Sequence, residues 1–543
     1  MTNKTQPVQP VQYEPDHQDH ADVEKDIKKT LDATTDEDVG ELGISFEDAD
    51  EAYAFLRNHP RSQEVTEGAA ALLADPVALK KLVRKIDFTI VPLIACVYFL
   101  QFLDKTTLAY TAVMGLRADT HLVGQQYSYL GMFFYVGFLV TEFPTQYLAQ
   151  HYSHIATYLG INVVLWGIIL ACHAACVNFA GLAVVRVLLG VCESCVAPIL
   201  VVIISMWYKK LEQGKRFSWF YVSNSLTSIV GGLVAYGVSF TNGKFASWRI
   251  FYIAIGLLTV IAGVVVIIFL PNSPVRARRF TDVEKVAALM RVKENQSGTQ
   301  NARFKPEQVR EAFSDVRIWL VALSVCLTSI PNGGISNFSN ILLTTFGYKP
   351  QQALILHTPG GLVGVVFVLF CGYFSDKWND RSTIMMLCLI PTILGAALMI
   401  GLDPNGVPIN KPGLLAASYL TGTFGASFML LLAWNASNIA GHTKRVTCNA
   451  LTLVAFCVGN ILGTQTFQAK DVPGYISGKA SIIACLCAQI FVSILLRWAN
   501  HRANAKKRRF LENISEDDMQ LLKDRMAFSD ETDLKNPFFV YTK

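Results

Sequence analysis

The sequence predicts an all-helical membrane protein of about twelve transmembrane helices in two groups of six. Hydrophobic residues make up 52% of the 543 positions and charged residues 16%, a balance outside that of ordinary soluble domains. Apolar stretches near the ~20 residues that a span requires recur along the chain. They lie at about 86–103, 127–149, 155–176, 179–207, 217–239 and 249–270, and then, after a polar gap, at about 318–343, 352–375, 383–402, 413–433, 446–468 and 477–499.

Basic residues in the short connections predict the orientation of these spans. The connections on one side contain Lys80, Lys81, Arg84, Lys85, Lys209, Lys210, Lys215, Arg216, Arg276, Arg278, Arg279, Lys377, Arg381, Lys444, Arg445 and the run from Lys506, whereas the other side contains scattered lysines. We therefore expect both termini to be cytoplasmic. The first 75 or so residues are polar and contain no apolar core of a signal peptide, so the first span is expected to direct insertion.

The polar segments divide the chain into five parts. We expect a largely disordered cytoplasmic tail at 1–85, a six-helix bundle at 86–270, a cytoplasmic linker at 271–316, a second bundle at 317–499 and a cytoplasmic tail at 500–543. A short helix is predicted near 45–57. In the linker, Thr281 and Glu284 have the spacing of a capping box and predict another short helix.

Two charged residues lie inside an apolar run that otherwise predicts a single span. Arg186 and Glu193 belong to the stretch RVLLGVCESCVAP. A charge at the centre of a bilayer costs about 2.5 to 3.5 kcal/mol on insertion scales, so its presence needs a reason. At about 100° per residue the two positions return to nearly the same face of a helix. We therefore expect both side chains to face one interior, either a packed seam or a watery cavity.

A charged motif lies between the eighth and ninth spans. Two repeated halves are typical of transporters with a binding site between them at the membrane midplane. The stretch GYFSDKWNDRST has the form G-x-x-x-D-[RK]-x-x-x-R and resembles the signature of the major facilitator superfamily. Asp376 can accept hydrogen bonds from backbone N–H groups, while Lys377 and Arg381 can reach a facing helix. This predicts a gate latch. The equivalent position in the first half, QYLAQHYSHIATY, lacks the pattern.

Two further stretches resemble one branch of that superfamily, the anion:cation symporters. The span with Arg186 and Glu193 resembles the fourth helix of the branch, and QFLDKTTLAY resembles its first helix, with Asp104 at the family aspartate and Lys105 where the family usually has arginine. Within the branch the chain is similar to the fungal allantoate permease group over about 80–543. The stretches SIPNGGISNFSNIL, GTQTFQAK, SWRIFYIAIG and NPFFVYT carry this similarity.

The resemblance implies proton-coupled uptake of a small organic anion, because members of the group carry allantoate, ureidosuccinate, nicotinate, pantothenate, biotin or small peptides. We expect Lys105 and Arg186 to attract a carboxylate, and Asp104 and Glu193 to hold exchangeable protons. The alternative for Arg186 and Glu193 is an internal salt bridge that braces two helices.

Four other residues are candidates for substrate binding. Asn332 and Asn337 belong to PNGGISNF, which is predicted to break a helix and to offer amides at the depth of the cavity, or else to form a gating hinge without ligand contact. Tyr135 in FFYVGF and Gln465 in GTQTF are weaker candidates, since aromatic residues and glutamines also serve as packing and hydrogen-bonding residues between helices.

We therefore predict a monomeric, multi-pass carrier of the plasma membrane that imports a small organic anion by alternating access with a proton as coupling ion. The alternative is a nutrient sensor that has the transporter fold but does not transport. The spans contain no combination of a nucleophile and a base, no metal cluster and no phosphate-binding loop. We therefore expect neither an enzyme nor a bound cofactor. The net charge of +5 is concentrated at cytoplasmic helix ends, which indicates membrane topology and anionic headgroups and no nucleic-acid partner.

Overall fold

The structure is a computed structural model of the whole chain, and it describes residues 62–152, 154–241, 243, 245–296, 305–378, 380–403, 407–512 and 532–542. The chain separates into the units Met1–Thr66 and Glu67–Lys543, and all the long apolar helices begin in the second. The helix predicted near 45–57 and most of the predicted N-terminal tail lie outside the described residues.

The described chain is helical and confirms the predicted set of spans. Ten segments of the described residues are long and apolar enough to cross a membrane, and α6 and α10 occupy the other two predicted spans as helices. The first half contains α4 (Pro76–Thr111), α6 (Gln126–His151), α7 (Ile155–Cys172), α8 (Phe179–Glu193) with α9 (Val196–Trp207), α10 (Lys210–Val238) and α11 (Ser247–Phe269). The second contains α14 (Val316–Thr345), α15 (Pro350–Leu356) with α16 (Thr358–Trp378), α17 (Arg381–Gly401), α18 (Lys411–Leu420) with α19 (Phe424–Ser437), α20 (His442–Thr466) and α21 (Ile476–Leu511). Short helices are α3 (Ser62–Ala74), α5 (Arg117–Asp119), α12 (Asp282–Gln296) and α13 (Pro306–Ser314).

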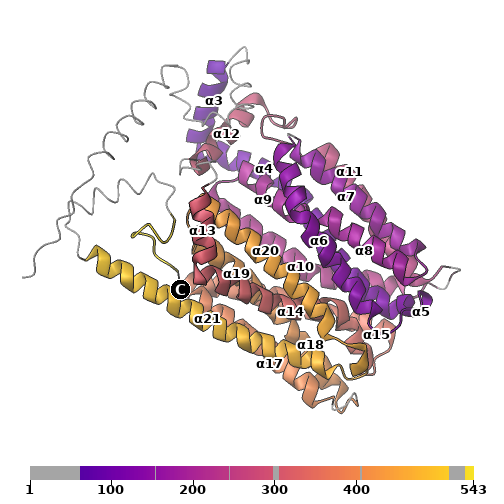
Figure 1. The fold of residues 1–543 in the computed structure, drawn as a ribbon. Coiled ribbons are helices and arrows are strands. Elements are labelled where there is room, and N and C mark those ends of the chain that lie inside the picture. Colours follow the sequence, from indigo (N-terminus) through magenta and orange to yellow (C-terminus); the bar gives the residue numbers. More distant parts are fainter. Residues whose placement is uncertain are drawn as a thin grey trace, which may run out of the picture. The chain divides into compact units, whose positions relative to one another are not determined.

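The helices of each half pack side by side, and a few of them join the halves (Figure 1). In the first half α6 packs on α8, α7 on α11 and α4 on α10; in the second, α14 packs on α20 and α21, and α17 on α19 and α21. Between the halves α6 contacts α20, α10 contacts α16 and α4 contacts α14. A Cβ atom at Gly190 would lie 2.1 Å from the carbonyl oxygen of Phe134, so this glycine lets α6 and α8 approach closely.

The predicted break at PNGGISNF is wrong, because α14 continues as one helix from Val316 to Thr345 with Pro331 inside it. The glycines serve helix packing instead. A Cβ at Gly333 would lie 2.4 Å from the carbonyl oxygen of Asn460, and one at Gly463 would lie 2.1 Å from that of Ile330. Small residues on both helices therefore allow α14 and α20 to pack backbone against backbone.

Two helices extend well beyond the predicted spans. α4 begins at Pro76 because the Asp75 side chain accepts a hydrogen bond from the Val77 N–H at 2.8 Å and proline suits the first helical position. α21 continues to Leu511, twelve residues past the predicted end at 499. Both extensions carry basic residues. A search for apolar stretches therefore ends before these parts of the helices.

The linker confirms the predicted capping box and contains a second helix that was not predicted. The N–H of Thr281 donates to Glu284 at 2.9 Å, and the N–H of Glu284 donates to the Thr281 hydroxyl at 3.3 Å, at the start of α12. α13 begins at Pro306 and packs on α20.

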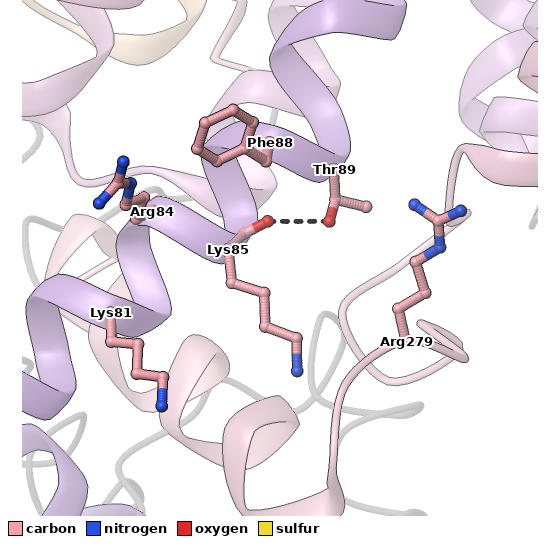
Figure 2. A pocket seen from close by; sticks show the side chains of 6 residues that line it. All are labelled: Lys81, Arg84, Lys85, Phe88, Thr89 and Arg279. Carbon is pink, nitrogen blue, oxygen red and sulfur yellow. Dashed lines mark hydrogen bonds between the residues drawn. The ribbon is translucent and has the colours of Figure 1, made fainter.

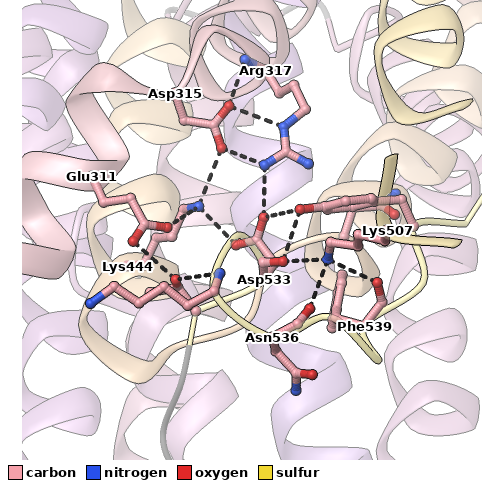
Figure 3. Close-up of polar contacts among 12 residues, drawn as sticks. Glu311, Asp315, Arg317, Lys444, Lys507, Asp533, Asn536 and Phe539 are labelled. Atoms are coloured by element: carbon pink, nitrogen blue, oxygen red, sulfur yellow. Dashed lines mark hydrogen bonds and ion pairs between the residues drawn. The ribbon is translucent and has the colours of Figure 1, made fainter. Parts of the chain in front are cut away.

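The end of the chain, residues 532–542, folds back onto the second half through a buried charge network (Figure 3). Asp533 forms ion pairs with Arg317 and Lys444, each at 2.8 Å. Lys444 also contacts Glu311 at 2.9 Å and Asp315 at 3.2 Å. Burial on its own would raise the pKa of the Asp315 carboxyl, but hydrogen bonds from Arg317 and the nearby cations lower it overall. The contribution of Asp315 to stability is therefore complete above its unfolded pKa and is lost only in acid.

We expect Asp533→Ala to destabilise the folded chain by about 3 kcal/mol, because it leaves the buried Lys444 with fewer carboxylate partners. Lys535→Ala is the matched control, since Lys535 belongs to the same segment but is exposed and lies 4.0 Å from Glu307. The thermal unfolding midpoint of the purified protein should fall for Asp533→Ala and stay unchanged for Lys535→Ala. Equal midpoints for both variants would show that the network adds little stability.

Candidate functional site

Arg186 is buried in α8 with a single hydrogen-bond partner among the described residues. Its side chain is 3% exposed, and its Nη2 donates to the Tyr252 hydroxyl of α11 at 2.9 Å. The Tyr252 ring stacks on His173 with 4.8 Å between ring centroids. The Nε of Arg186 has no hydrogen-bond partner, and Arg186 forms no salt bridge with a described carboxylate. The alternative of an Arg186–Glu193 salt bridge therefore does not describe this conformation.

Asp104 and Glu193 form a pair of buried carboxyl groups between α4 and α8. Both side chains are fully buried, and their carboxyl groups lie within hydrogen-bonding reach of each other. Trp166 in α7 donates to Asp104 at 2.6 Å, while neither carboxylate oxygen of Glu193 has a donor among the described residues. Two ionised carboxylates repel each other in a medium of low dielectric constant, so a proton shared between them stabilises the pair.

Glu193 is the last residue of α8, where the predicted continuous span is interrupted before Val196. Pro198 lacks the N–H that would donate to the carbonyl of Ser194, which explains the interruption. Beside this interruption, Gln101 in α4 donates to the Glu193 backbone carbonyl at 3.4 Å. The proline thus sets Glu193 at a helix end that faces α4.

Lys105 follows Asp104 on α4 but occupies a different environment. Its ammonium lies 5.2, 5.9 and 5.7 Å from the ring centroids of Phe102, Phe134 and Phe138, which stabilise a cation through their π faces. Lys105 also interacts electrostatically with Asp104, Glu193 and the buried Glu142 of α6. The structure therefore places one cation among three acidic groups.

The other predicted binding residues divide between this cluster and the seam between the halves. Tyr135 is buried in α6, interacts electrostatically with Arg186 and Glu193, and contacts Phe456 of α20 at 6.2 Å between ring centroids. The amide of Asn332 donates to the Asn460 side chain at 2.8 Å and thereby joins α14 to α20.

Asn337 and Gln465 lie where the two halves meet at the end opposite the linker helices. Tyr127 donates to the Asn337 carbonyl at 2.7 Å, and the Gln465 amide donates to the Ser128 carbonyl at 3.4 Å. Ser128 in turn donates to the Phe467 carbonyl at 3.2 Å. Tyr127 also interacts electrostatically with Arg186, so the seam adjoins the arginine. Substrate-binding roles for Asn332, Asn337 and Gln465 remain predictions.

The predicted latch residues lie at the junction of α16 and α17. Asp376 belongs to α16, and its side chain lies outside the described part of the structure. Lys377 is exposed and lies 5.8 Å from the Tyr373 ring of its own helix, whereas Arg381 reaches a facing helix, donating to the Ala433 carbonyl of α19 at 2.9 Å. A latch role for these three residues remains a prediction.

Asp380 is the residue of this junction that the sequence interpretation missed. It caps α17 by accepting from the Thr383 N–H at 3.0 Å and pairs with Arg497 of α21 at 3.1 Å. Burial alone would raise the pKa of Asp380, but these hydrogen bonds and Arg497 lower it overall. The carboxylate therefore stays ionised at neutral pH and holds the start of α17 against α21.

The sequence interpretation also missed Glu142, Trp166 and Tyr252. Glu142 is the one acidic residue in its apolar stretch, so the criterion that identified Arg186 also applies to it. Trp166 and Tyr252 carry no such signal, since both are aromatic residues in apolar runs. Two surface pockets of the described structure lie elsewhere, at the start of α4 and beside Asp533. The candidate site is thus a packed, polar cluster inside the first half.

This arrangement can bind an anion and a proton side by side. The Arg186 guanidinium uses one N–H group for Tyr252 and has others available for a carboxylate. The Asp104–Glu193 pair can gain or lose a proton without the formation of a new ion pair. Among the described residues no group of three or more His, Cys, Asp or Glu side chains could hold a metal ion. Two groups of apolar helices with buried charged residues inside the first are typical of membrane transporters.

The chain belongs to the Major Facilitator Superfamily, whose sequence pattern matches residues 94–464. It is 33% identical to the allantoate permease of Saccharomyces cerevisiae over 494 residues, which cover 89% of this chain and 90% of the permease. It is 31% identical to a thiamine pathway transporter of the same yeast, with 93% and 95% of the two chains covered. These likenesses confirm the predicted allantoate permease-like group.

Comparison with solved structures gives the same fold. A D-xylose-proton symporter superposes with a TM-score of 0.57 at 12% identity, covering 75% of this chain and 97% of that one. Because it belongs to this family of carriers, the protein is a multi-pass membrane transporter and not an enzyme.

Proposed function

We propose that this transporter is a proton-coupled symporter that imports a small organic anion across the plasma membrane. The observation that carries the proposal is the buried Arg186, which has a hydrogen bond to Tyr252 and no carboxylate partner, beside the Asp104–Glu193 pair. A buried guanidinium that forms no salt bridge has N–H groups free for an anionic ligand, and a negative charge there would offset the cost of burying the cation.

The cluster has two parts, Arg186 for the substrate anion and the Asp104–Glu193 pair for the proton, and this arrangement supports coupling of substrate to proton. A carboxylate on the substrate would accept the free N–H groups of Arg186, and this negative charge would favour protonation of the adjacent acidic pair. Because the pair lies 0% exposed in this conformation, it can exchange protons only when the halves rearrange. Proton and substrate would then move in the same conformational step, which is the requirement for symport.

Contacts between the halves support alternating access. The hydrogen bonds that join the halves in the described part of the chain lie at one end, where Tyr127 and Ser128 of α6 meet Asn337 and Phe467. Positive residues in the connections predict that this end is extracellular. Breaking these few contacts would open the cluster to that side.

The substrate class is a small carboxylate such as allantoate or ureidosuccinate, nicotinate or a related vitamin acid, or a dipeptide. The likeness to allantoate permease supports the first of these, and the single Arg186 suits any ligand with one carboxylate. Lys105, held among aromatic rings, adds positive potential without a defined pairing geometry.

The test is uptake by the purified chain in proteoliposomes under an imposed inward proton gradient. Labelled allantoate, ureidosuccinate, nicotinate and a dipeptide are supplied in turn, with protein-free liposomes as control. We expect one of them to accumulate above its external concentration and a protonophore to abolish the accumulation. Uptake without dependence on the gradient would refute coupling, and no uptake of any anion by folded protein would favour a sensor that does not transport.

A further inference from the structure

A basic pocket at the linker end of α4 has no place in the transport cycle described above. It has a volume of about 600 Å³ and lies between α4 and the connection that leads from α11 to α12 (Figure 2). Its lining residues are Lys81, Arg84, Lys85, Phe88, Thr89 and Arg279. Four of these six side chains are cationic.

Positive charge exceeds negative charge in this pocket. Lys85 pairs with Glu284 of α12 at 2.6 Å, and the same Glu284 oxygen, Oε2, also accepts from the Thr281 N–H. Burial alone would raise the pKa of Glu284, but these bonds lower it, so the Glu284 carboxylate stays ionised at neutral pH. Lys81, Arg84 and Arg279 form no ion pair in the described structure. Three exposed cations therefore face the pocket without a counter-ion.

Aromatic rings extend the pocket on its apolar side. Phe88 is 70% exposed and lies 5.7 Å below the Arg84 guanidinium. Phe269, at the end of α11, is 43% exposed and lies 5.1 Å from the Arg279 guanidinium. Both residues stand where their helices enter the apolar zone, since the hydrophobic run of α4 begins at Ile86. Exposed aromatic rings beside cations at a helix end are typical of the membrane interface.

We propose that this pocket binds the headgroup of a multiply charged anionic phospholipid from the cytoplasmic leaflet. Phosphate groups would occupy the space between Lys81, Arg84 and Arg279, and the acyl chains would run along Phe88 and Phe269. A soluble anion would account for the cations but not for the two exposed rings at the edge of the apolar zone. Basic pockets beside transmembrane helices on the cytoplasmic side suit such headgroups.

The bound lipid would connect α4 to the linker. Arg279 comes from the connection before α12, whereas Lys81 and Arg84 come from α4, so one headgroup would join segments that are nearly 200 residues apart in sequence. The Lys85–Glu284 pair joins the same two segments directly, with a sequence separation of 199. The lipid would therefore strengthen an attachment that the protein already makes.

The test measures lipid binding to the purified full chain in a zwitterionic detergent, which avoids the general attraction of an anionic surface. The probes are phosphatidylinositol 4,5-bisphosphate, phosphatidylserine and soluble inositol 1,4,5-trisphosphate, and native mass spectrometry counts the bound molecules. The test variant combines Lys81→Gln, Arg84→Gln and Arg279→Gln. The matched control combines Lys506→Gln, Arg508→Gln and Arg509→Gln, which removes the same charge from exposed positions at the end of α21.

We expect the bisphosphate lipid to bind the unmodified chain more tightly than phosphatidylserine. Each cation contributes roughly fivefold in affinity, so the test variant should bind on the order of 100-fold more weakly. The control should bind as the unmodified chain does, and Phe88→Ala should weaken the lipid more than the soluble phosphate. Equal binding by the test variant and the control would overturn the site. Soluble inositol phosphate that binds as tightly as the lipid would overturn the lipid assignment.

Discussion

The Arg186→Ala variant is expected to reach the membrane in normal amounts and to lose uptake of the anion. The guanidinium is 3% exposed, donates to the Tyr252 hydroxyl and forms no salt bridge with a described carboxylate. An anion that leaves water for this environment needs a fixed positive partner. Truncating one member of such a buried pair costs about 2 to 5 kcal/mol, which corresponds to a loss of affinity of roughly thirtyfold or more.

Two further variants separate binding from structure. Arg186→Lys keeps the charge but not the paired N–H groups and should restore part of the uptake. Arg249→Ala removes an arginine of the same half that lies over the Trp248 ring at 4.9 Å, and it should leave uptake unchanged. Surface labelling and the thermal midpoint of purified protein check the amount and folding of each variant. Normal uptake by folded, surface-located Arg186→Ala would rule out the binding role.

The Glu193→Gln variant is expected to uncouple exchange from accumulation. Its side chain is fully buried, and an amide can donate a hydrogen bond to Asp104 as a protonated carboxyl group does. The loaded carrier should therefore still alternate, while the release of a proton from this position is blocked. Exchange of labelled for unlabelled substrate across proteoliposomes should persist, and uptake driven by an inward proton gradient should fall to background.

Glu142→Gln tests whether the third acidic group around Lys105 takes part in coupling. Glu142 is also a buried glutamate, but its carboxylate accepts from Gln146 of its own helix at 3.1 Å and does not belong to the Asp104–Glu193 pair. We expect Glu142→Gln to keep both activities, and a loss of gradient-driven uptake in this variant would show that coupling extends beyond the pair. If both activities survive in Glu193→Gln, Asp104 becomes the better candidate for the coupling acid. If both vanish while the protein remains folded, Glu193 serves binding or structure.

Several features of the site can be read from the sequence because they follow from the cost of charge in an apolar medium. Arg186 and Glu193 are identified by their place in an apolar run, and the structure buries both around Asp104. The same criterion applies to Glu142. The glycines of PNGGISNF show the limit of local reasoning. Glycine is equally compatible with a broken helix and with close helix packing. Here Gly333 packs against the backbone carbonyl of Asn460 in α20, so its role is close packing.

The sequence by itself determined the twelve spans, their division into two halves and the buried charges. A bilayer requires helices of a certain length whose backbone groups are satisfied internally, and this constraint acts within each segment. Only the tertiary structure decided which groups the charges meet. Trp166 reaches Asp104 across 62 residues and Tyr252 reaches Arg186 across 66. The Asp533 network likewise joins the chain end to α14 and α20. Such contacts depend on how separate helices pack, and this packing depends on side-chain shape, which composition and periodicity do not describe.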